Sequence, residues 1–369
     1  MKLFFLLVIT IVPVCFSCHE IYNPDTDNVS SALVVSGRIT DQPGPYTIQL
    51  SLAVPYDGAN VRPAVQKAKV SITNDDGNTY KFTETGNGNY VSNPAEMIGQ
   101  PGKTYTLHIE TTDGNNYESE PQTLQPNDFT TNVYAQSSSQ DNLVEDAYGG
   151  ITKVTIPGVD LLVDIQNNSD TLPRFRFIPV VTVEYAYSII ISPMLTYTYF
   201  CWNTSFFNDI NITSEKYQSS STDIKKHAIY FQSANDYFDV VYTDPVTKKD
   251  SILQAPIINY LIKLERYRIS NQTYQFYKDI NTLLSAEGKL FDPIASQVKG
   301  NIKCKTDSRK LVLGFFDASS IRTSYYAIRP GQLNVRTLQS FNVTPSNGCT
   351  GGVSSGEVIT AFPPDFWVY

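Results

Sequence analysis

The sequence predicts a mainly β protein, with an N-terminal immunoglobulin-like β-sandwich followed by a larger β-rich domain that contains one inserted helix. Three observations predict this class. Apolar and polar residues alternate with a period of two in many short segments, as in strands with one buried and one wet face. Asp-Gly turns join several of these segments. Only one stretch, at about residues 271–286, has clear helical spacing.

The composition is that of a folded chain with an acidic surface. Of 369 residues, 41% are hydrophobic and 17% are charged, and the formal net charge is −8. Without an N-terminal signal about 350 residues would remain, which is long for one core and natural for two domains. An acidic chain lacks the basic surface that follows phosphates, so we expect no nucleic-acid partner.

The first eighteen residues indicate where the protein resides. Lys2 precedes a nearly continuous apolar run, Leu3–Val14, which is too short to span a bilayer and has the size of a signal-peptide core. The run ends at Ser17-Cys18, a small residue directly before a cysteine, as bacterial lipoprotein signals do. Residues 1–18 are therefore predicted to be a lipoprotein signal, with Cys18 carrying the lipid (palmitate-type acyl chains). Cys15 is a weaker alternative for the lipidated residue, because Val14 before it is not small. An ordinary secretory signal is the other alternative, and either signal exports the chain.

Residues 19–31 and 32–127 read as a tether and a first domain. The tether is polar and rich in turn formers. In the first domain, short alternating segments are separated by turns such as Asn74–Asn78 and Thr112–Asn115, which is typical of an immunoglobulin-like sandwich. The predicted strands are Leu33–Ile39, Tyr46–Leu52, Ala68–Thr73, Tyr80–Glu84, Tyr90–Val91, Thr104–Glu110 and Asn116–Glu120.

Residues 128–158 have a different composition, rich in Ser, Asn, Gln and Gly with scattered apolar residues. We predict a linker there, a loop-rich boundary between the domains. The second domain is expected over 159–369. Its predicted strands are Asp160–Gln166, Arg174–Tyr187, Leu195–Trp202, Asp209–Thr213, Ala228–Gln232, Phe238–Thr243, Ile257–Ser270, Gln297–Lys303, Leu311–Ala318 and Ser324–Arg329.

The predicted helix at about 271–286 rests on apolar residues spaced by three or four positions. Ser270 or Asn271 can cap its start, and Gly288 can end it. A stripe of this kind is more often core than binding site, so we interpret it as core. The stripe consists of Tyr274, Tyr277, Ile280, Leu283 and Leu284.

Three cysteines lie beyond the signal region, Cys201, Cys304 and Cys349. An oxidising envelope compartment permits a disulfide, and three cysteines allow three pairings. The favoured candidate is Cys304–Cys349, which leaves Cys201 buried and free. None of the three has C-x-x-C spacing, so the sequence indicates no zinc or redox site, and we expect no metal and no cofactor.

No catalytic motif of the sequence lies in the structural context that its chemistry requires. Gly352–Gly356 fits G-x-S-x-G by letter, but it lies in a Gly/Ser-rich loop with no histidine after it. His19, His108 and His227 lack metal-ligand spacing; His108 lies on the polar phase of its strand, and His227 is expected to be structural. We therefore predict no catalytic residue and no enzyme. A glycosidase stays open, because it needs only two carboxylates and no pair is singled out.

Several stretches, taken in order, resemble one family. It is a family of Bacteroidota outer-membrane lipoproteins of unknown function, domain of unknown function 4249, and the resemblance covers nearly the whole mature chain. It implies an outer-membrane lipoprotein, often encoded beside TonB-dependent receptors, and it implies no catalytic residues. The stretches are Leu33–Asp41 with Pro43-Gly44-Pro45, Gly99–Leu107, Asp113–Ser119, Cys201-Trp202, Leu290–Pro293, Gly300–Ile302, Leu313–Phe316 with Ala318-Ser319, and Pro364–Trp367.

The main hypothesis is a lipid-anchored, non-enzymatic outer-membrane protein that serves as an accessory or ligand-capturing partner of a TonB-dependent transporter. Its expected partners are the membrane, through the N-terminal lipid, and such a receptor. The expected location is the outer membrane, facing the cell surface, with the periplasmic face also open. One alternative is a surface glycan-active hydrolase, which needs two carboxylates in a cleft. The other is a structural or adhesive surface protein, which predicts an exposed strand edge or self-assembly.

Overall fold

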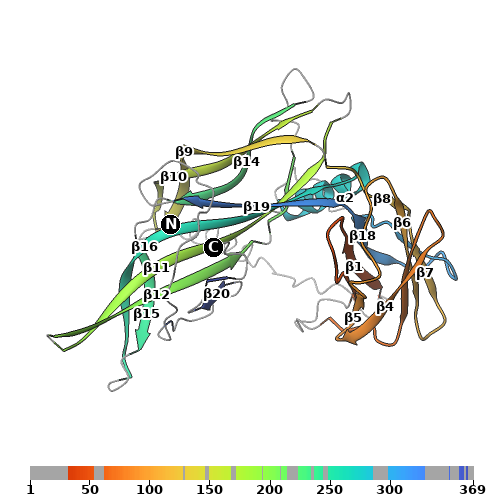
Figure 1. The fold of residues 1–369 in the computed structure, drawn as a ribbon, viewed down its shortest axis with the longest axis horizontal. Coiled ribbons are helices and arrows are strands. Elements are labelled where there is room, and N and C mark those ends of the chain that lie inside the picture. Colours follow the sequence, from red (N-terminus) through yellow and green to blue (C-terminus); the bar gives the residue numbers. More distant parts are fainter. Residues whose placement is uncertain are drawn as a thin grey trace, which may run out of the picture.

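The computed structural model shows two bodies of strands joined end to end, with a helix at the junction (Figure 1). The mainly β class predicted from the sequence is confirmed, and α2 (Asn271–Leu284) is the one helix of the described residues. None of those residues forms a helix with the length and apolar character needed to cross a membrane. The described residues are 32–53, 62–127, 129–145, 149–167, 172–192, 194–207, 209–213, 223–233, 237–243, 248–285, 298–328, 349, 357–360 and 363–364.

The first domain is one ten-stranded sheet that curls around its core into a barrel-like body. The strand order is β17-β7-β6-β3-β4-β5-β2-β1-β18, and β8 pairs with β6. The seven strands predicted over 32–127 lie within two residues of the observed β1 to β7. The bounds are β1 Leu33–Ile39, β2 Thr47–Leu52, β3 Lys69–Asn74, β4 Thr79–Gly86, β5 Asn89–Ser92, β6 Thr104–Glu110, β7 Asn116–Ser119, β8 Gln122–Thr123, β17 Ile302–Cys304 and β18 Val312–Ala318.

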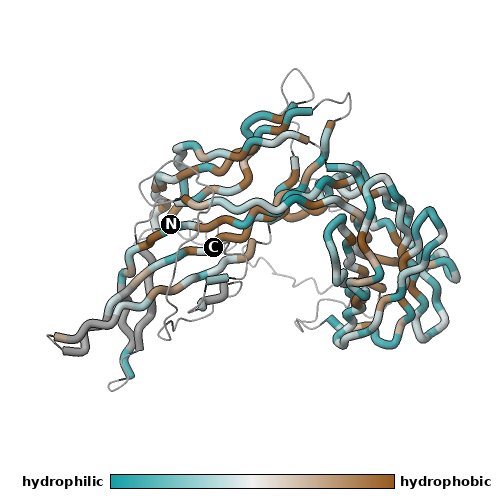
Figure 2. Tube along the Cα trace, in the orientation of Figure 1, coloured by the Kyte–Doolittle hydropathy of each residue, from teal (hydrophilic) through white to brown (hydrophobic). Residues whose placement is uncertain are grey.

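Alternation positions these strands because one face of each is buried. In β6, for example, Tyr105, Leu107 and Ile109 are buried and the residues between them are not. Figure 2 shows the same division, with apolar positions gathered inside the first domain and along the middle of the second. An immunoglobulin-like sandwich has two sheets, whereas the strands of this domain form one continuous sheet. The immunoglobulin-like topology is therefore not confirmed and stays a prediction.

Strands β17 and β18 join the first sheet although the sequence places them far along the chain, in the range expected for the second domain. β18 pairs in parallel with β1 over its full length, from Leu33 opposite Val312 to Ile39 opposite Ala318. The two ends of the sheet, β17 and β18, then meet through Asn301. Its buried side chain donates to the carbonyl oxygen of Phe316 at 2.8 Å and accepts from the Phe316 N–H at 2.9 Å.

The second domain consists of a three-stranded sheet, β14-β10-β9, packed on a seven-stranded sheet, β15-β16-β11-β12-β20, with β13 on β11 and β19 on β16. Their shared core contains Leu161 and Val163 of β10, Phe177 of β11 and Ile262 of β16. The bounds are β9 Thr130–Glu145, β10 Ile151–Gln166, β11 Phe175–Ser192, β12 Leu195–Phe206, β13 Asn211–Ile212, β14 Ile224–Ser233, β15 Tyr237–Thr243, β16 Asp250–Arg268, β19 Ser320–Ile328 and β20 Glu357–Thr360.

The loop-rich boundary predicted over 128–158 is wrong. This range contains most of β9 and the first half of β10, two strands of 16 residues each in an unbroken antiparallel register. Every residue of β9 from Ser139 to Glu145 is exposed, and so is every residue of β10 from Ile151 to Thr155. A strand that is exposed to solvent on both faces needs no alternation of apolar and polar residues, so this range lacks the periodicity that indicates a strand.

The helix α2 forms where its spacing and cap predict it. Ser270 accepts a hydrogen bond from the Thr273 N–H through its hydroxyl oxygen at 3.1 Å, which confirms the predicted N-cap. The helix ends at Leu284, two residues short of the prediction, and Gly288 lies outside the described residues. Its buried face, with Thr273 and Tyr274, packs at the junction between the domains.

We expect Gly314→Ala to destabilise the first domain by at least about 3 kcal/mol, measured by urea unfolding. Gly314 has φ +90°, and an added Cβ would overlap the carbonyl oxygen of Val35 in the neighbouring strand. Gly77→Ala is the control, because Gly77 also has a positive φ, +84°, but has open space around it. It should cost only about 1 kcal/mol. Equal costs would contradict the close packing of β18 on β1.

Candidate functional site at the junction of the two domains

Of the site residues that the sequence singles out, Cys18 and Gly352–Gly356 lie outside the described residues. Lipid attachment therefore stays a prediction. His108 is half exposed on β6, with Nε2 at 2.9 Å from the Thr73 hydroxyl oxygen. His227 is buried on β14.

The disulfide expectation needs a correction, because the structure joins Cys201 to Cys349 rather than Cys304 to Cys349. Cys201 lies on β12 in the second domain, where Tyr185, Ala255 and Cys349 pack around it. Cys304 lies on β17, buried in the core of the first domain, and is the free cysteine among the described residues. The preferred pairing failed because β17 belongs to the other body, a placement that sequence order does not reveal.

The two domains are joined most directly by a strand that passes from one into the other. β18 ends at Ala318 in the first sheet, β19 begins at Ser320 in the second, and only Ser319 lies between them. The Ser319 N–H donates to the carbonyl oxygen of Ile39 at 3.1 Å. The Ser320 hydroxyl donates to the carbonyl oxygen of Gln125, on the segment that leads towards β9. The crossing strand is thus held on both sides.

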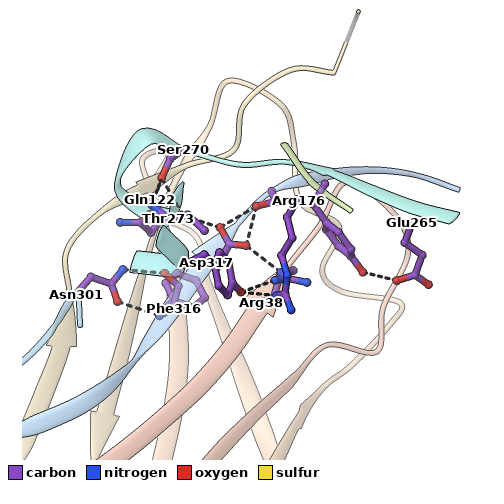
Figure 3. Close-up of polar contacts among 12 residues, drawn as sticks. Arg38, Gln122, Arg176, Glu265, Ser270, Thr273, Asn301, Phe316 and Asp317 are labelled. Carbon is purple, nitrogen blue, oxygen red and sulfur yellow. Dashed lines mark hydrogen bonds and ion pairs between the residues drawn. The ribbon is translucent and has the colours of Figure 1, made fainter. Parts of the chain in front are cut away.

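A buried carboxylate stands beside this crossing. Asp317, the second-last residue of β18, is 3% exposed. Its Oδ2 accepts from Arg38 Nε of β1 at 2.9 Å, and its Oδ1 accepts from the Thr273 hydroxyl of α2 at 2.9 Å. The Ser319 hydroxyl lies within 2.8 Å of both oxygens. Figure 3 shows Arg38 of β1 and Thr273 of α2 turned towards Asp317.

Two arginines, one from each domain, meet at one phenol. Arg38 Nη2 donates to the Tyr277 hydroxyl oxygen at 2.8 Å, and Arg176 Nη1 of β11 donates to the same oxygen at 2.6 Å. The guanidinium of Arg38 also lies 4.2 Å above the Tyr267 ring, and that of Arg176 lies 4.2 Å above the Tyr277 ring. Cation–π contacts of this kind are strongest where water is excluded.

We call Arg38, Arg176, Tyr267, Thr273, Tyr277, Asp317 and Ser319 the junction network. Burial by itself lowers the pKa of the Arg38 guanidinium, but Tyr277, the Asp317 carboxylate and Tyr267 together hold it above its ordinary value. Burial also raises the pKa of the Tyr267 phenol to about 12. The network therefore keeps the Arg38 guanidinium charged and the Tyr267 phenol neutral at physiological pH.

The same arrangement extends along β16. Tyr267 donates through its hydroxyl to Glu265 Oε2 at 2.7 Å, and Lys263 Nζ lies 2.7 Å from Glu265 Oε1. Burial acts to raise the pKa of the Glu265 carboxyl, but the hydrogen bonds from Lys263 and Tyr267 outweigh it and hold this pKa below its usual range. On the opposite side of the crossing, Arg322 Nη1 of β19 lies 2.7 Å from Asp41 Oδ2.

The charged groups of the junction network have a structural role. Each charged group of the junction network is turned towards another member, so the network joins the domains instead of presenting a reactive group. Among the described residues no three His, Cys, Asp or Glu side chains lie together as metal ligands do. The absence of catalysis stays a prediction. The Ser319 and Thr273 hydroxyls that donate to Asp317 are fully buried, so the network presents no accessible nucleophile.

An open groove of about 680 Å³ lies beside the junction, between α2 and β13. His227 and Asn211 are among its lining residues, with Asp209, Lys278 and Asn281. His227 Nε2 donates to Asn211 Oδ1 at 2.8 Å, while Asn211 Nδ2 donates to the carbonyl oxygens of Ala228 and Ile229. Burial lowers the pKa of His227 to about 4, so the imidazole is neutral at pH 7.

Sequence reasoning missed the junction network. Arg38 and Asp317 lie in strands that were correctly predicted, yet nothing paired them, and the two residues are 279 positions apart. A usable signal was present in β18, whose sequence VLGFFDA carries one carboxylate among apolar residues. A charge in a buried strand requires a partner, so such a residue marks a polar contact even when the partner is unknown.

Comparison with known proteins gives one match. Residues 19–325 match the family described as Domain of unknown function (DUF4249). The match therefore spans both domains and the crossing strand, and ends within β19. No curated protein and no solved structure matches the chain.

We expect Asp317→Asn to destabilise the protein by about 3–5 kcal/mol in urea unfolding, because it leaves the buried Arg38 guanidinium without its counter-charge. Replacing Arg38 with Met in the same chain should recover part of this loss, since the uncompensated charge is then removed. Asp307→Asn is the control: its ion pair with Arg309 is on the surface, and no change in stability is expected. Additive effects of Asp317→Asn and Arg38→Met would contradict the proposed coupling.

Acid should destabilise the second domain through His227. Its pKa is about 4 in the folded chain against 6.5 for an ordinary histidine, so the unfolded chain binds more protons as the pH falls below about 6.5. The folded state therefore loses stability, by about 2 kcal/mol between pH 7 and pH 5. His227→Gln should remove this part of the pH dependence of urea unfolding. An unchanged pH dependence in the His227→Gln chain would refute the assignment.

Proposed function

The chain belongs to the DUF4249 family, and from that premise we propose that it is a lipid-anchored outer-membrane protein, attached through Cys18, which serves as a non-enzymatic accessory or ligand-capturing partner of a TonB-dependent transporter. The observation that carries the proposal is the apolar run Leu3–Val14 ending at Ser17-Cys18. A Bacteroidota origin, the transporter partnership and the cell-surface location are parts of this proposal.

The two domains support different roles in it. The first domain, expected to be immunoglobulin-like, begins with β1 directly after the tether of residues 19–31, which suits a spacer next to the membrane. The second domain is joined to it by the crossing strand and the junction network rather than by a free linker. A binding surface on the second domain would thus be presented to a membrane partner in a defined direction.

A hydrolase is the weaker proposal on the described residues. The groove beside α2 contains one carboxylate, that of Asp209. A second groove, over the first sheet, contains Glu110 and Glu118, but Glu110 pairs with Lys69 and Glu118 with Lys305 on an open strand surface. A glycosidase needs one carboxyl group with a raised pKa and a second that is free to act as base or nucleophile.

Gentle detergent extraction of the tagged full-length protein from its own membranes tests the proposal. Mass spectrometry of the purified material should find one TonB-dependent barrel in a stoichiometric amount. A lone lipoprotein in repeated extractions would overturn the partnership and direct attention to glycan and peptide binding.

The matched controls are two cysteine substitutions in the signal region. Cys18→Ala should abolish lipid labelling with a palmitate analogue, release the protein from the membrane fraction and remove the barrel from the purified material. Cys15→Ala, three residues earlier and after the non-small Val14, should leave all three unchanged. Normal lipidation of the Cys18→Ala chain would refute the anchor itself.

A further inference from the structure

Within the part of the chain that the structure describes, the outer edge of β9 is unpaired along its whole length. β9 is the last strand of the order β14-β10-β9, and no described residue pairs with its other side. Figure 1 shows it as the outer strand along one margin of the second domain. The 16 residues Thr130–Glu145 pair with β10 without a bulge or a shift of register. The free side thus presents a long, regular row of backbone donors and acceptors.

This edge lacks the features that normally protect an exposed strand. Natural edge strands are short, bulged, covered, or interrupted by proline or an inward lysine. β9 is long, and its sequence TTNVYAQSSSQDNLVE contains no proline, glycine, lysine or arginine. Its charges are confined to Asp141 and Glu145 near the distal end. Such an edge is a template for another strand.

Apolar side chains are exposed near the same edge. Leu143 of β9 is 74% exposed and Ile151 of β10 is 73% exposed. Odd-numbered residues of β9 share the face whose proximal part, at Val133 and Ala135, packs against the core of the second domain. The core-facing side of the paired strands β9 and β10 therefore extends beyond the core, and Leu143 on that side is left uncovered.

We propose that β9 pairs antiparallel with β9 of a second copy of this chain, about a two-fold axis at Ser138. The segment Gln136-Ser137-Ser138-Ser139-Gln140 reads the same in both directions, so it meets itself with like residues opposite, Ser against Ser and Gln against Gln. The two three-stranded sheets would become one six-stranded sheet. The pairing depends on neither the lipid anchor nor a transporter, so it stands apart from the proposed function.

The register follows from which side chains face each other. In two registers the core-facing side chains of both copies lie on the same side of the combined sheet, and 15 residues of β9 overlap. The two-fold axis lies at Ser138 in one register and at Ser137 in the other. An axis at Ser138 sets Leu143 of each copy opposite Val133 of the other, and Asp141 opposite Ala135. An axis at Ser137 sets Val133 opposite Asp141, an apolar residue against a charge. The first register also brings the exposed Leu143 to the margin of the partner's core.

Site-specific cross-linking of the full-length protein in its own membranes tests the pairing. Ser138→Cys should give a covalent dimer with a short bismaleimide, which alkylates two thiols, because the two Ser138 positions lie opposite each other at the axis. Gln136→Cys should stay monomeric, since its counterpart lies four residues along the strand, roughly 13 Å away. A chain carrying both Gln136→Cys and Gln140→Cys should cross-link again. The native chain gives the background, because Cys304 is buried.

A second pair of variants tests the register by removing an apolar contact that only the proposed register makes. Leu143→Lys in the Ser138→Cys chain removes two symmetric apolar pairs, so the dimer dissociation constant should rise between roughly two- and thirty-fold. Val154→Lys is the control, because Val154 is also exposed but lies on β10, away from the free edge of β9. A folded Ser138→Cys chain that yields only monomer, or equal cross-linking at residues 136 and 138, would overturn the proposal. Cross-linking of Ser138→Cys to a different protein would overturn it too and identify that protein's strand as the occupant.

Discussion

The orientation of the two domains depends on one buried charge at the point where the chain passes from the first sheet into the second. Placing the Asp317 carboxylate there costs solvation, and the cost is offset only if each oxygen finds a donor. Arg38, Thr273 and Ser319 supply those donors from β1, from α2 and from the crossing strand itself. Because no two of these come from the same element, the bonds to one carboxylate fix three elements relative to each other.

The strands of the first domain were predictable from sequence because their chemistry is local. A strand with one buried face must alternate, and the residues of β6 show that requirement directly in Tyr105, Leu107 and Ile109. β9 shows the converse. Its distal half is wet on both faces, and nothing about a doubly exposed strand distinguishes Ser-Ser-Ser-Gln from a loop. Its strand form is imposed by its partner, β10, through a backbone register that side chains do not encode.

The junction and the disulfide could not be predicted for a different reason, which is that both depend on which body a segment joins. β18 is a strand by its pattern, but its parallel pairing with β1 across 279 residues is a property of the whole chain. The same holds for β17. Because it belongs to the first domain, Cys304 lies there too, and Cys201 is the described cysteine that lies near Cys349. Asp317 alone gave a local sign, since a charge within a buried strand needs a partner.

Arg38 lies on the strand that connects the predicted anchor to this junction. β1 begins at Leu33, immediately after the predicted tether, and carries Arg38 five residues later. If the proposed anchor is correct, one short strand would receive the chain from the membrane side and also hold the Asp317 carboxylate that aligns the second domain. An apolar interface could bury as much surface, but apolar contacts are not directional, whereas a guanidinium bonded at once to a carboxylate and a phenol has few alternative geometries. A protein that must present one face of its far domain to a membrane partner, or one free strand edge to a second copy, needs a joint of the second kind.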